Sequence, residues 1–233
     1  MIAKPGRRDL TEPQAWRPIS LLSCLGKGLK RLIACRLAWA AMYYSVLHSQ
    51  QARALPKRSA TDLVTILIYD IEEAFARKKV ATLVTIDVQG AFDTVMCNRL
   101  MLRLREQGWP DHLARWAGSF ISGRSAHVRY QDTVTPSSPL QCGLPQGSPV
   151  SPILFLLYTE PIYRLGNPRG RFGYVDNMAI LSIGGIGAVN GVSFDTKKTE
   201  VMHFSHSKLR TAPAVRHGDA EKHPESALRW LGI

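Results

Sequence analysis

Apolar residues recur at helical spacing in two stretches of the first third of the chain. Between residues 19 and 42 they are interspersed with Lys and Arg, which predicts an amphipathic helix that begins after Pro18. A second helix is predicted from about Leu63 to Ala76, with Ser59 or Thr61 as its N-cap. Each of these helices has an apolar face that needs a packing partner.

Two of the strand patterns in the chain contain a carboxylate. Residues 81–88 form a short, β-branched and almost continuous apolar run, typical of a strand buried on both faces, so the charge of Asp87 near its end is unexpected. Two short apolar arms flank Asp176 and Asn177, residue types that tolerate left-handed backbone. A tight hairpin with this dipeptide at its tip is therefore predicted.

The segment between these strands contains further helical and hairpin patterns. Asp111 is well placed as the N-cap of a helix, and residues 126–141 suggest a hairpin. A Gly/Pro loop then leads into a long apolar helix, with Ser148 as its N-cap and Pro149 at its first position. Together these patterns predict an α+β fold.

The composition indicates a globular chain with an affinity for polyanions. The sequence is 45% hydrophobic, and its net charge of +12 with a pI near 9.9 favours nucleic acid or an acidic membrane surface as a partner. The apolar run Val150–Tyr158 is too short to span a bilayer, and the N-terminus has no signal-peptide pattern, so a soluble intracellular protein is expected. The four cysteines are too widely spaced to indicate a zinc site or a disulfide framework: Cys24, Cys35, Cys97 and Cys142.

Asp87 and Asp176 are the main candidates for chemistry. Burying two carboxylates near the ends of apolar strands is unfavourable unless a cation pairs with them. Mg²⁺ prefers oxygen ligands and is often held by one or two carboxylates and substrate phosphates, which fits this pair. The alternative is that each is an ordinary turn or cap residue.

Six motifs occur in an order that resembles the reverse transcriptases of non-LTR, LINE-type retrotransposons. Six spaced motifs in the correct order are far more specific than any single one. The motifs are WRPISLLSCLGKGLKRLIACRL from residue 16, LVTIDVQGAFDTV from 83, GLPQGSPVSPILFLLY from 143, FGYVDN from 172, NGVSFDTKKTEVMHFS from 190 and RWLGI from 229.

The resemblance implies a right-hand polymerase fold with an antiparallel palm sheet backed by helices. Fingers are expected in residues 1–80 and the palm in 81–204, internally shortened near 183–191 where the family has a helix. Residues 205–233 are expected to form a loosely ordered tail that ends at a segment resembling the primer grip, where the thumb should begin.

The resemblance also assigns metal and catalytic roles. It implies that Asp87, Val88 and Asp176 hold two Mg²⁺ ions, with Mn²⁺ as a possible substitute, for nucleotidyl transfer from a deoxynucleotide to a primer 3′-hydroxyl. Lys198 resembles a lysine that protonates the leaving pyrophosphate, although the adjacent Lys197 leaves the register open. Such enzymes use an RNA template and a DNA primer, and nuclear location is expected by analogy.

Further residues resemble the parts of these enzymes that bind the nucleotide and template. Phe92 resembles the residue that excludes a ribose 2′-hydroxyl, although it could be plain core, and the Gly/Pro loop could be a mere connection. Two basic residues resemble finger residues that contact the triphosphate, although they could be solvated charges. The candidates are Lys4, Arg17, Phe92, Gly143, Pro145, Gln146, Gly147 and Ser148.

One substitution leaves three functional hypotheses open. The family hairpin normally has two consecutive aspartates, and Asn177 takes the second position here, which should weaken metal affinity and slow catalysis about a hundredfold or more. The first hypothesis is an active RNA-directed DNA polymerase. The second is a catalytically inactive nucleic-acid-binding remnant, and the third is a decayed element without selected function.

Overall fold

The computed structural model describes residues 1–4, 9–12, 15–88, 90–130, 132–165, 170–183, 199–205, 215–217 and 220–225. Two compact units can be distinguished, and both are discontinuous in sequence. The first consists of Met1–Val46 and Gly90–Tyr158, and the second of Leu47–Gln89 and Thr159–Ile233. The division into fingers at 1–80, palm at 81–204 and a tail at 205–233 stays a prediction.

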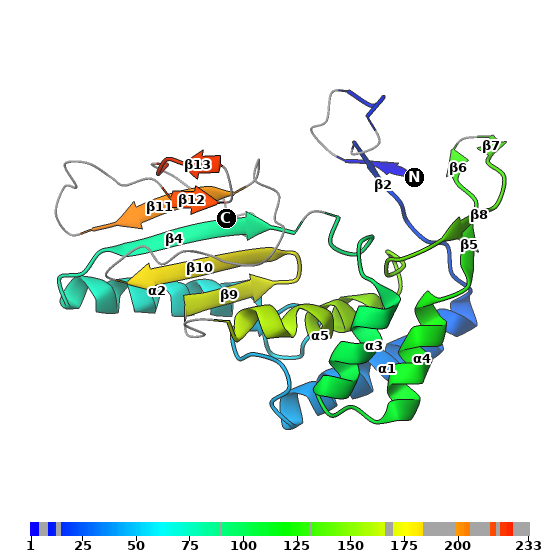
Figure 1. Cartoon of the computed structure of the whole chain (residues 1–233), viewed down its shortest axis with the longest axis horizontal. Helices are drawn as coiled ribbons and strands as arrows, with labels where there is room; N and C mark the ends of the chain where they lie inside the picture. The colour runs from blue at the N-terminus through cyan, green and yellow to red at the C-terminus, as the bar shows by residue number, and fades with distance from the viewer. Residues whose placement is uncertain are drawn as a thin grey trace. The chain divides into compact units, whose positions relative to one another are not determined.

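The first unit combines helices with short antiparallel ribbons (Figure 1). Strand β1 pairs with β2, β5 with β8, and β6 with β7, which agrees with the hairpin predicted for residues 126–141. The elements are β1 (Ile2–Ala3), β2 (Trp16–Arg17), α1 (Cys24–Tyr43), α3 (Cys97–Glu106), α4 (Asp111–Ile121), β5 (Arg124–Ala126), β6 (Arg129–Tyr130), β7 (Thr133–Val134), β8 (Ser138–Leu140) and the larger part of α5 (Ser151–Tyr163).

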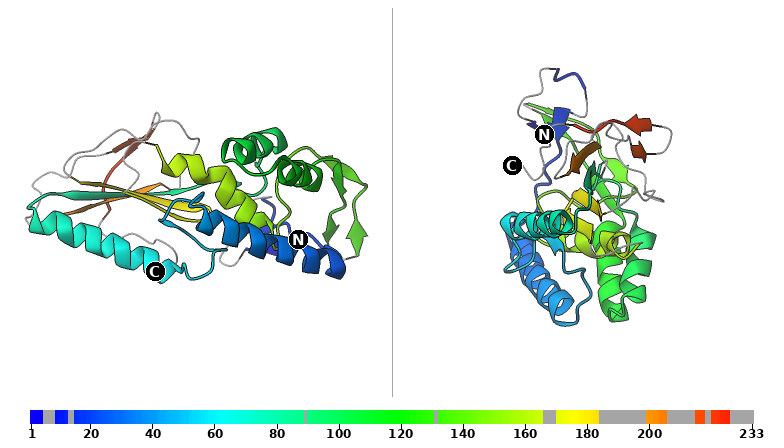
Figure 2. Two further views of the ribbon diagram at one scale, coloured as in Figure 1. Left: turned by 90° about the horizontal axis from the view of Figure 1, so that it is seen from below. Right: turned by 90° about the vertical axis from the view of Figure 1, so that its left-hand side faces the viewer.

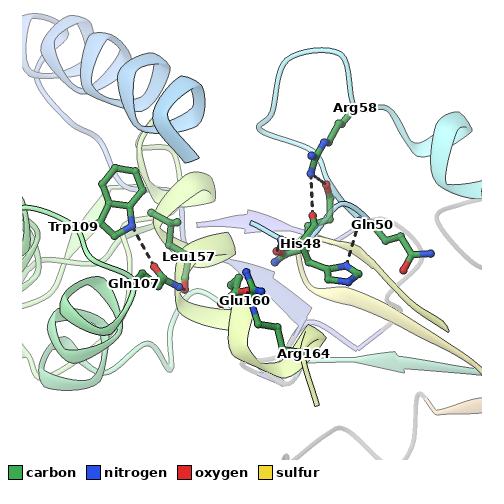
Figure 3. A network of polar contacts seen from close by, with 9 residues as sticks. His48, Gln50, Arg58, Gln107, Trp109, Leu157, Glu160 and Arg164 are labelled. Carbon is green, nitrogen blue, oxygen red and sulfur yellow. Dashed lines mark hydrogen bonds and ion pairs between the residues drawn. The ribbon is translucent and has the colours of Figure 1, made fainter. Parts of the chain in front are cut away.

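Helices α3 and α4 pack closely, and the end of α3 is tied to α5. A Cβ atom at Gly118 of α4 would lie 2.5 Å from the Met101 sulfur on α3, so a larger residue there would require the flexible Met101 side chain to move. The Gln107 Nε2 donates to the Leu157 carbonyl (2.8 Å), and the Gln107 Oε1 accepts from the Trp109 indole (3.3 Å; Figure 3). These bonds fix the chain that precedes α4.

The second unit is built on a five-stranded sheet in the order β11-β4-β10-β9-β3. All neighbours are antiparallel except β3 and β9, which are parallel. The elements are β3 (Gln51–Ala52), α2 (Ala60–Ala76), β4 (Ala81–Asp87), β9 (Arg171–Tyr174), β10 (Asn177–Ile183), β11 (Glu200–Phe204), and the separate pair β12 (Val215–His217) and β13 (Ala220–Lys222).

Apolar side chains cover both faces of this sheet. Helix α2 runs along one face (Figure 2) and buries Leu63 and Leu67 against Leu83 and Phe172. A second cluster, formed by Val84, Ile86, Tyr163, Met178 and Val201, contains the other set of alternating β4 positions. Strand β4 is therefore buried on both faces, as its nearly continuous apolar run predicted.

The two predicted N-terminal helices are confirmed, but α1 begins later than predicted and α2 begins earlier, at Ala60. Helix α2 begins with a capping box in which Ser59 and Asp62 exchange side-chain-to-backbone bonds, so Ser59 is the cap. Helix α1 begins at Cys24, later than predicted, with Ser23 as its cap. Upstream of α1, the Ser20 N–H donates to the Gln146 carbonyl (2.8 Å), so this part of the chain bonds to the Gly/Pro loop instead of continuing the helix.

Two predicted caps were wrong. Asp111 is the first residue of α4 rather than its cap, and its carboxylate accepts from Arg105 and Arg115 instead. Helix α5 begins at Ser151 rather than at Pro149, and the buried Ser148 hydroxyl has no hydrogen-bond partner among the described residues. The Ser151 hydroxyl instead donates to the Pro145 carbonyl (2.9 Å).

The chain agrees with the predicted α+β class. Within the described ranges, no helix is long and apolar enough to cross a membrane.

Candidate functional site

Asp87 and Asp176 lie at the same end of the central sheet. Asp87 is the last residue of β4 and pairs directly with Asn177, the first residue of β10. The Val88 N–H donates to the Asp176 carbonyl (3.0 Å), which ties the chain after β4 to the turn that precedes β10. Since directly paired residues in antiparallel strands have Cα atoms about 4.5–5.5 Å apart, the sheet brings these four residues together, as the sequence predicted.

The hairpin between β9 and β10 exists, but its tip lies one residue earlier than predicted. Tyr174 pairs with Asn177, so Val175 and Asp176 form the two-residue turn. Val175 has a φ of 62°, a left-handed conformation that is a strained choice for a β-branched residue. A positive φ at the first turn position alone is the pattern of a type II′ turn, whose twist suits a hairpin. Val175 is buried, which helps to hold this conformation.

Tyr163 lies beneath the hairpin and explains a glycine in the FGYVDN motif. Its side chain is fully buried, and a Cβ atom at Gly173 would overlap its hydroxyl group. Burial raises the pKa of the Tyr163 hydroxyl well above its ordinary range, and the negative charge of Asp176 contributes to the rise. The phenol is therefore neutral and acts as a fixed support for the strand that carries the turn.

A partly buried polar network in the second unit was not predicted (Figure 3). One Arg58 nitrogen donates to the main-chain carbonyls of His48 (2.9 Å) and Gln51 (3.1 Å). On α5 the almost fully buried Glu160 forms an ion pair with Arg164. Burial lowers the pKa of His48, and the charge of Arg164 lowers it further while Glu160 opposes this. The sequence signal for this network was a carboxylate, Glu160, within an apolar helix.

The donors near Asp87 fit a hard divalent cation held with the help of substrate. In the described ranges no three His, Cys, Asp or Glu side chains gather in a way that could hold a metal ion. The ligands available here are two carboxylates and main-chain oxygens. Mg²⁺ commonly binds to such a small set of protein ligands and fills its other positions with water and phosphate oxygens. The Asn177 amide nitrogen lies 3.4 Å from Asp176 Oδ1, so a weak donor occupies the position of the family's second carboxylate.

The Gly/Pro loop is joined to the turn that follows β4, within the first unit. The Gly143 N–H donates to the Val95 carbonyl (2.8 Å), and the Leu144 N–H donates to the Phe92 carbonyl (2.6 Å). The Gln146 Nε2 donates to both carboxylate oxygens of Asp93 (3.1 Å each). Asp93 therefore fixes the side chain of Gln146, a predicted substrate-binding residue.

Two glycines of the loop are required by its shape. Gly143 has a φ of 92°, and a Cβ atom there would come within 2.9 Å of the Asp93 backbone. Gly147 has a φ of 104°, and a Cβ atom there would lie 3.3 Å from the Ser20 carbonyl oxygen. Pro145 is buried between them. The backbone therefore approaches neighbouring segments closely, which glycine permits because it has no side chain.

The remaining predicted substrate-binding residues lie in the first unit. Phe92 is half-buried and packs on Phe155, with ring centroids 5.1 Å apart. Arg17 is exposed in β2, where it pairs with Ile2, and Lys4 directly follows β1, so both basic residues belong to the β1–β2 ribbon. Lys198 lies outside the described residues.

Comparison with known proteins identifies the family. Residues 2–233 match the family described as reverse transcriptase (RNA-dependent DNA polymerase). The chain belongs to this reverse transcriptase family.

Curated relatives come from retrotransposons, which confirms the resemblance found in the sequence. A probable RNA-directed DNA polymerase from transposon BS of Drosophila melanogaster is 31% identical over 188 residues, which are 78% of this chain and 20% of that protein. The RNA-directed DNA polymerase from mobile element jockey of the same species is 28% identical over 160 residues, 69% of this chain and 17% of that protein. The chain thus spans about a fifth of the length of these relatives.

A solved structure shares the fold. Telomerase from Candida albicans, in complex with the TWJ fragment of telomeric RNA, superposes with a TM-score of 0.54 over 84% of this chain and 37% of that chain, at 12% identity. At this identity the likeness concerns the fold alone.

Proposed function

We propose that the chain is the polymerase core of a retrotransposon reverse transcriptase, which extends a DNA primer on an RNA template with deoxynucleotides. The observation that carries the proposal is the placement of Asp87 and Asp176 at one end of β4 and β10, in a chain of the reverse transcriptase family. In this assignment the five-stranded sheet corresponds to the palm. Activity would take place in the nucleus, where chromosomal DNA provides the primer.

Asp87, the main-chain oxygen of Val88 and Asp176 would hold Mg²⁺ ions. When bound, such ions supply positive charge to the primer 3′-oxygen and to the leaving pyrophosphate during in-line displacement. The protein would hold the two carboxylates in position before the substrate binds. The hydrogen bond from Val88 to Asp176 and the packing of Tyr163 against Gly173 would fix them.

The first unit would bind and select the nucleotide. Phe92, held against Phe155, would exclude a ribose 2′-hydroxyl, and Gln146, fixed by Asp93, would contact the nucleotide or template. Arg17 and Lys4 would bind the triphosphate, because guanidinium and ammonium groups donate hydrogen bonds to phosphate oxygens.

A catalytically inactive nucleic-acid-binding protein is the second candidate. The Asn177 amide opposite Asp87 removes a negative charge from the site, while the net charge of +12 still favours binding to phosphates.

Primer extension on a poly(A) RNA template tests both candidates. The parent protein is compared with Asn177→Asp and Asp87→Ala, first with Mg²⁺ and then with Mn²⁺. Extension by the parent that Asp87→Ala abolishes would establish the polymerase. Extension by Asn177→Asp alone would show an intact site silenced by one amide and support the second candidate. If all three proteins bind primer–template but extend nothing, the polymerase proposal fails.

A further inference from the structure

The outer face of α1 carries large apolar side chains that no described residue covers. The left view of Figure 2 shows the whole length of this helix. The rings of Trp39 and Tyr43 stack on each other, with centroids 4.9 Å apart. An exposed apolar surface of this extent usually marks an interaction site. The exposed fractions are 91% for Leu25, 60% for Leu29, 51% for Leu32, 60% for Trp39 and 67% for Tyr43.

These residues follow the spacing of a coiled-coil seam. They are separated alternately by four and three residues, and the only polar member of the series is the exposed Arg36, between Leu32 and Trp39. A strict 3.5-residue repeat suits a partner helix, whereas a helix that packs into a globular core usually has a broader apolar stripe. At Gly28, beside the seam, an added Cβ atom would meet nothing within 4 Å, so a second backbone can approach there.

We propose that α1 pairs antiparallel with α1 of a second copy of this chain, about a twofold axis at Ala34. The seam is self-complementary in this register. Leu25 faces the partner subunit's Tyr43, and Leu29 faces the partner subunit's Trp39. A parallel pair would place the two Arg36 side chains opposite each other in one layer, whereas the antiparallel pair places each opposite the partner subunit's Leu32.

The charges beside the seam are compatible with self-association. The residues that flank it on both sides are uncharged: Gly26, Gly28, Ile33, Cys35, Ala40 and Met42. Lys30 points away from the seam and lies over the Phe120 ring, 5.1 Å from its centroid. The net charge of +12 opposes association at long range, and salt screens that repulsion.

The size of the contact predicts a weak dimer. Five large side chains bury on the order of 500 Å² per copy, about 1,000 Å² in total, which lies near the lower limit of specific interfaces. The dimer is therefore expected to dissociate in the micromolar range and to become tighter as salt concentration rises.

Analytical ultracentrifugation of the full chain over a concentration series tests the proposal without reference to polymerase activity. Leu29→Glu and Trp39→Glu should each weaken the dimer at least tenfold. Arg36→Leu should strengthen it at least tenfold, because it removes a charge from the seam. The control Ile68→Glu, at a half-exposed apolar position on α2, should leave the dimer unchanged. Circular dichroism verifies that each variant is folded.

Native cysteines report the register. In the proposed pair each Cys35 lies one residue from the level of the twofold axis, and both lie on the same side of the seam. The two Cys35 residues are therefore about 3 Å apart along the helix direction, whereas the two Cys24 residues are about 30 Å apart. Oxidation or a short bis-maleimide should therefore give a covalent dimer that Cys35→Ser removes and Cys24→Ser does not.

Three outcomes would overturn the pairing. A monomer throughout the micromolar range would mean that α1 has another occupant, such as nucleic acid or a different protein segment. A dimer that tolerates Leu29→Glu and Trp39→Glu would lie elsewhere on the surface. Cross-links through Cys24 instead of Cys35 would exclude the antiparallel register.

Discussion

At the scale of single residues, Asn177 determines how much negative charge the site carries. Its direct pairing with Asp87 means that a carboxylate at this position would add a third negative charge beside Asp87 and Asp176. Like charges directly opposite each other across two strands are unfavourable unless a cation lies between them. With asparagine at this position, the end of the sheet carries two negative charges instead of three, which reduces their mutual repulsion.

Asn177→Asp should lower the free energy of unfolding by up to about 1 kcal/mol in a metal-free buffer. Mg²⁺ should restore most of this loss, because binding to the folded state alone stabilises it. Thermal unfolding of the parent and the variant, with and without Mg²⁺, measures both effects. An equal response of the two proteins to Mg²⁺ would argue against a metal site at this position.

Asp93→Ala should raise the KM for deoxynucleotides more than it lowers kcat, because Gln146 loses the group that fixes its side chain. Global stability should change little, since Asp93 is exposed. Steady-state primer extension gives KM and kcat. It is carried out in the Asn177→Asp background if the parent protein is catalytically inactive. A fall in kcat at constant KM would instead indicate a general distortion of the loop. Asp93→Asn is the matched conservative variant.

At the scale of elements, the hairpin depends on how α5 supports β9. Tyr163 occupies the space that a side chain at Gly173 would need, and the strained Val175 lies two residues further along. This packing joins segments that share no local sequence signal, and it positions the turn that carries Asp176.

Gly173→Ala should destabilise the protein by about 1–3 kcal/mol, the usual range for inserting a methyl group into a packed interior. Urea denaturation followed by circular dichroism gives the change in free energy. The double variant Gly173→Ala with Tyr163→Leu should be less destabilised than the sum of the two single variants, because the smaller side chain leaves room for the new methyl group. Strict additivity would show that the two positions do not interact.

The network around His48 should make stability depend on pH. Burial lowers the pKa of His48 from 6.5 in the folded chain, so the unfolded chain binds more protons between that lowered value and 6.5. Stability should therefore fall as the pH drops through this window and should level off once His48 is charged in both states. Urea denaturation at several pH values measures the slope, and His48→Gln should flatten it. An unchanged slope in the variant would assign the effect to another group.

At the scale of the whole molecule, the sequence predicted what depends on local pattern and on motif order. The α+β class, helix α2, strand β4, and the meeting of Asp87 with Asp176 all followed from periodicity or motifs, and Ser59 was one of the two caps expected for α2. The exact hairpin tip did not, because Val175 has none of the turn-forming chemistry of Asn, Asp or Gly.

Long-range packing accounts for most of the remaining features. Arg58 and Glu160 both lie near His48 but come from distant parts of the sequence, so no local signal connects them. The cap predicted at Ser148 failed because the loop backbone bonds to other segments and leaves that hydroxyl buried. The interleaving of two units likewise depends on contacts between segments far apart in the chain.

The net charge of the whole molecule leads to a prediction that distinguishes nucleic-acid binding from catalysis. A chain with a net charge of +12 should bind an RNA–DNA hybrid with an affinity that falls steeply with salt, because each phosphate neutralised by Lys or Arg releases bound counterions. Arg17→Ala should reduce the slope of log K against log salt by about 1, as expected for the loss of one phosphate contact. Asp87→Ala should leave the slope unchanged, because Asp87 neutralises no phosphate. Fluorescence anisotropy in a potassium chloride series without divalent ions gives these slopes. If Arg17→Ala leaves the slope unchanged, the β1–β2 ribbon does not contact the nucleic acid backbone, and its basic residues are solvated charges.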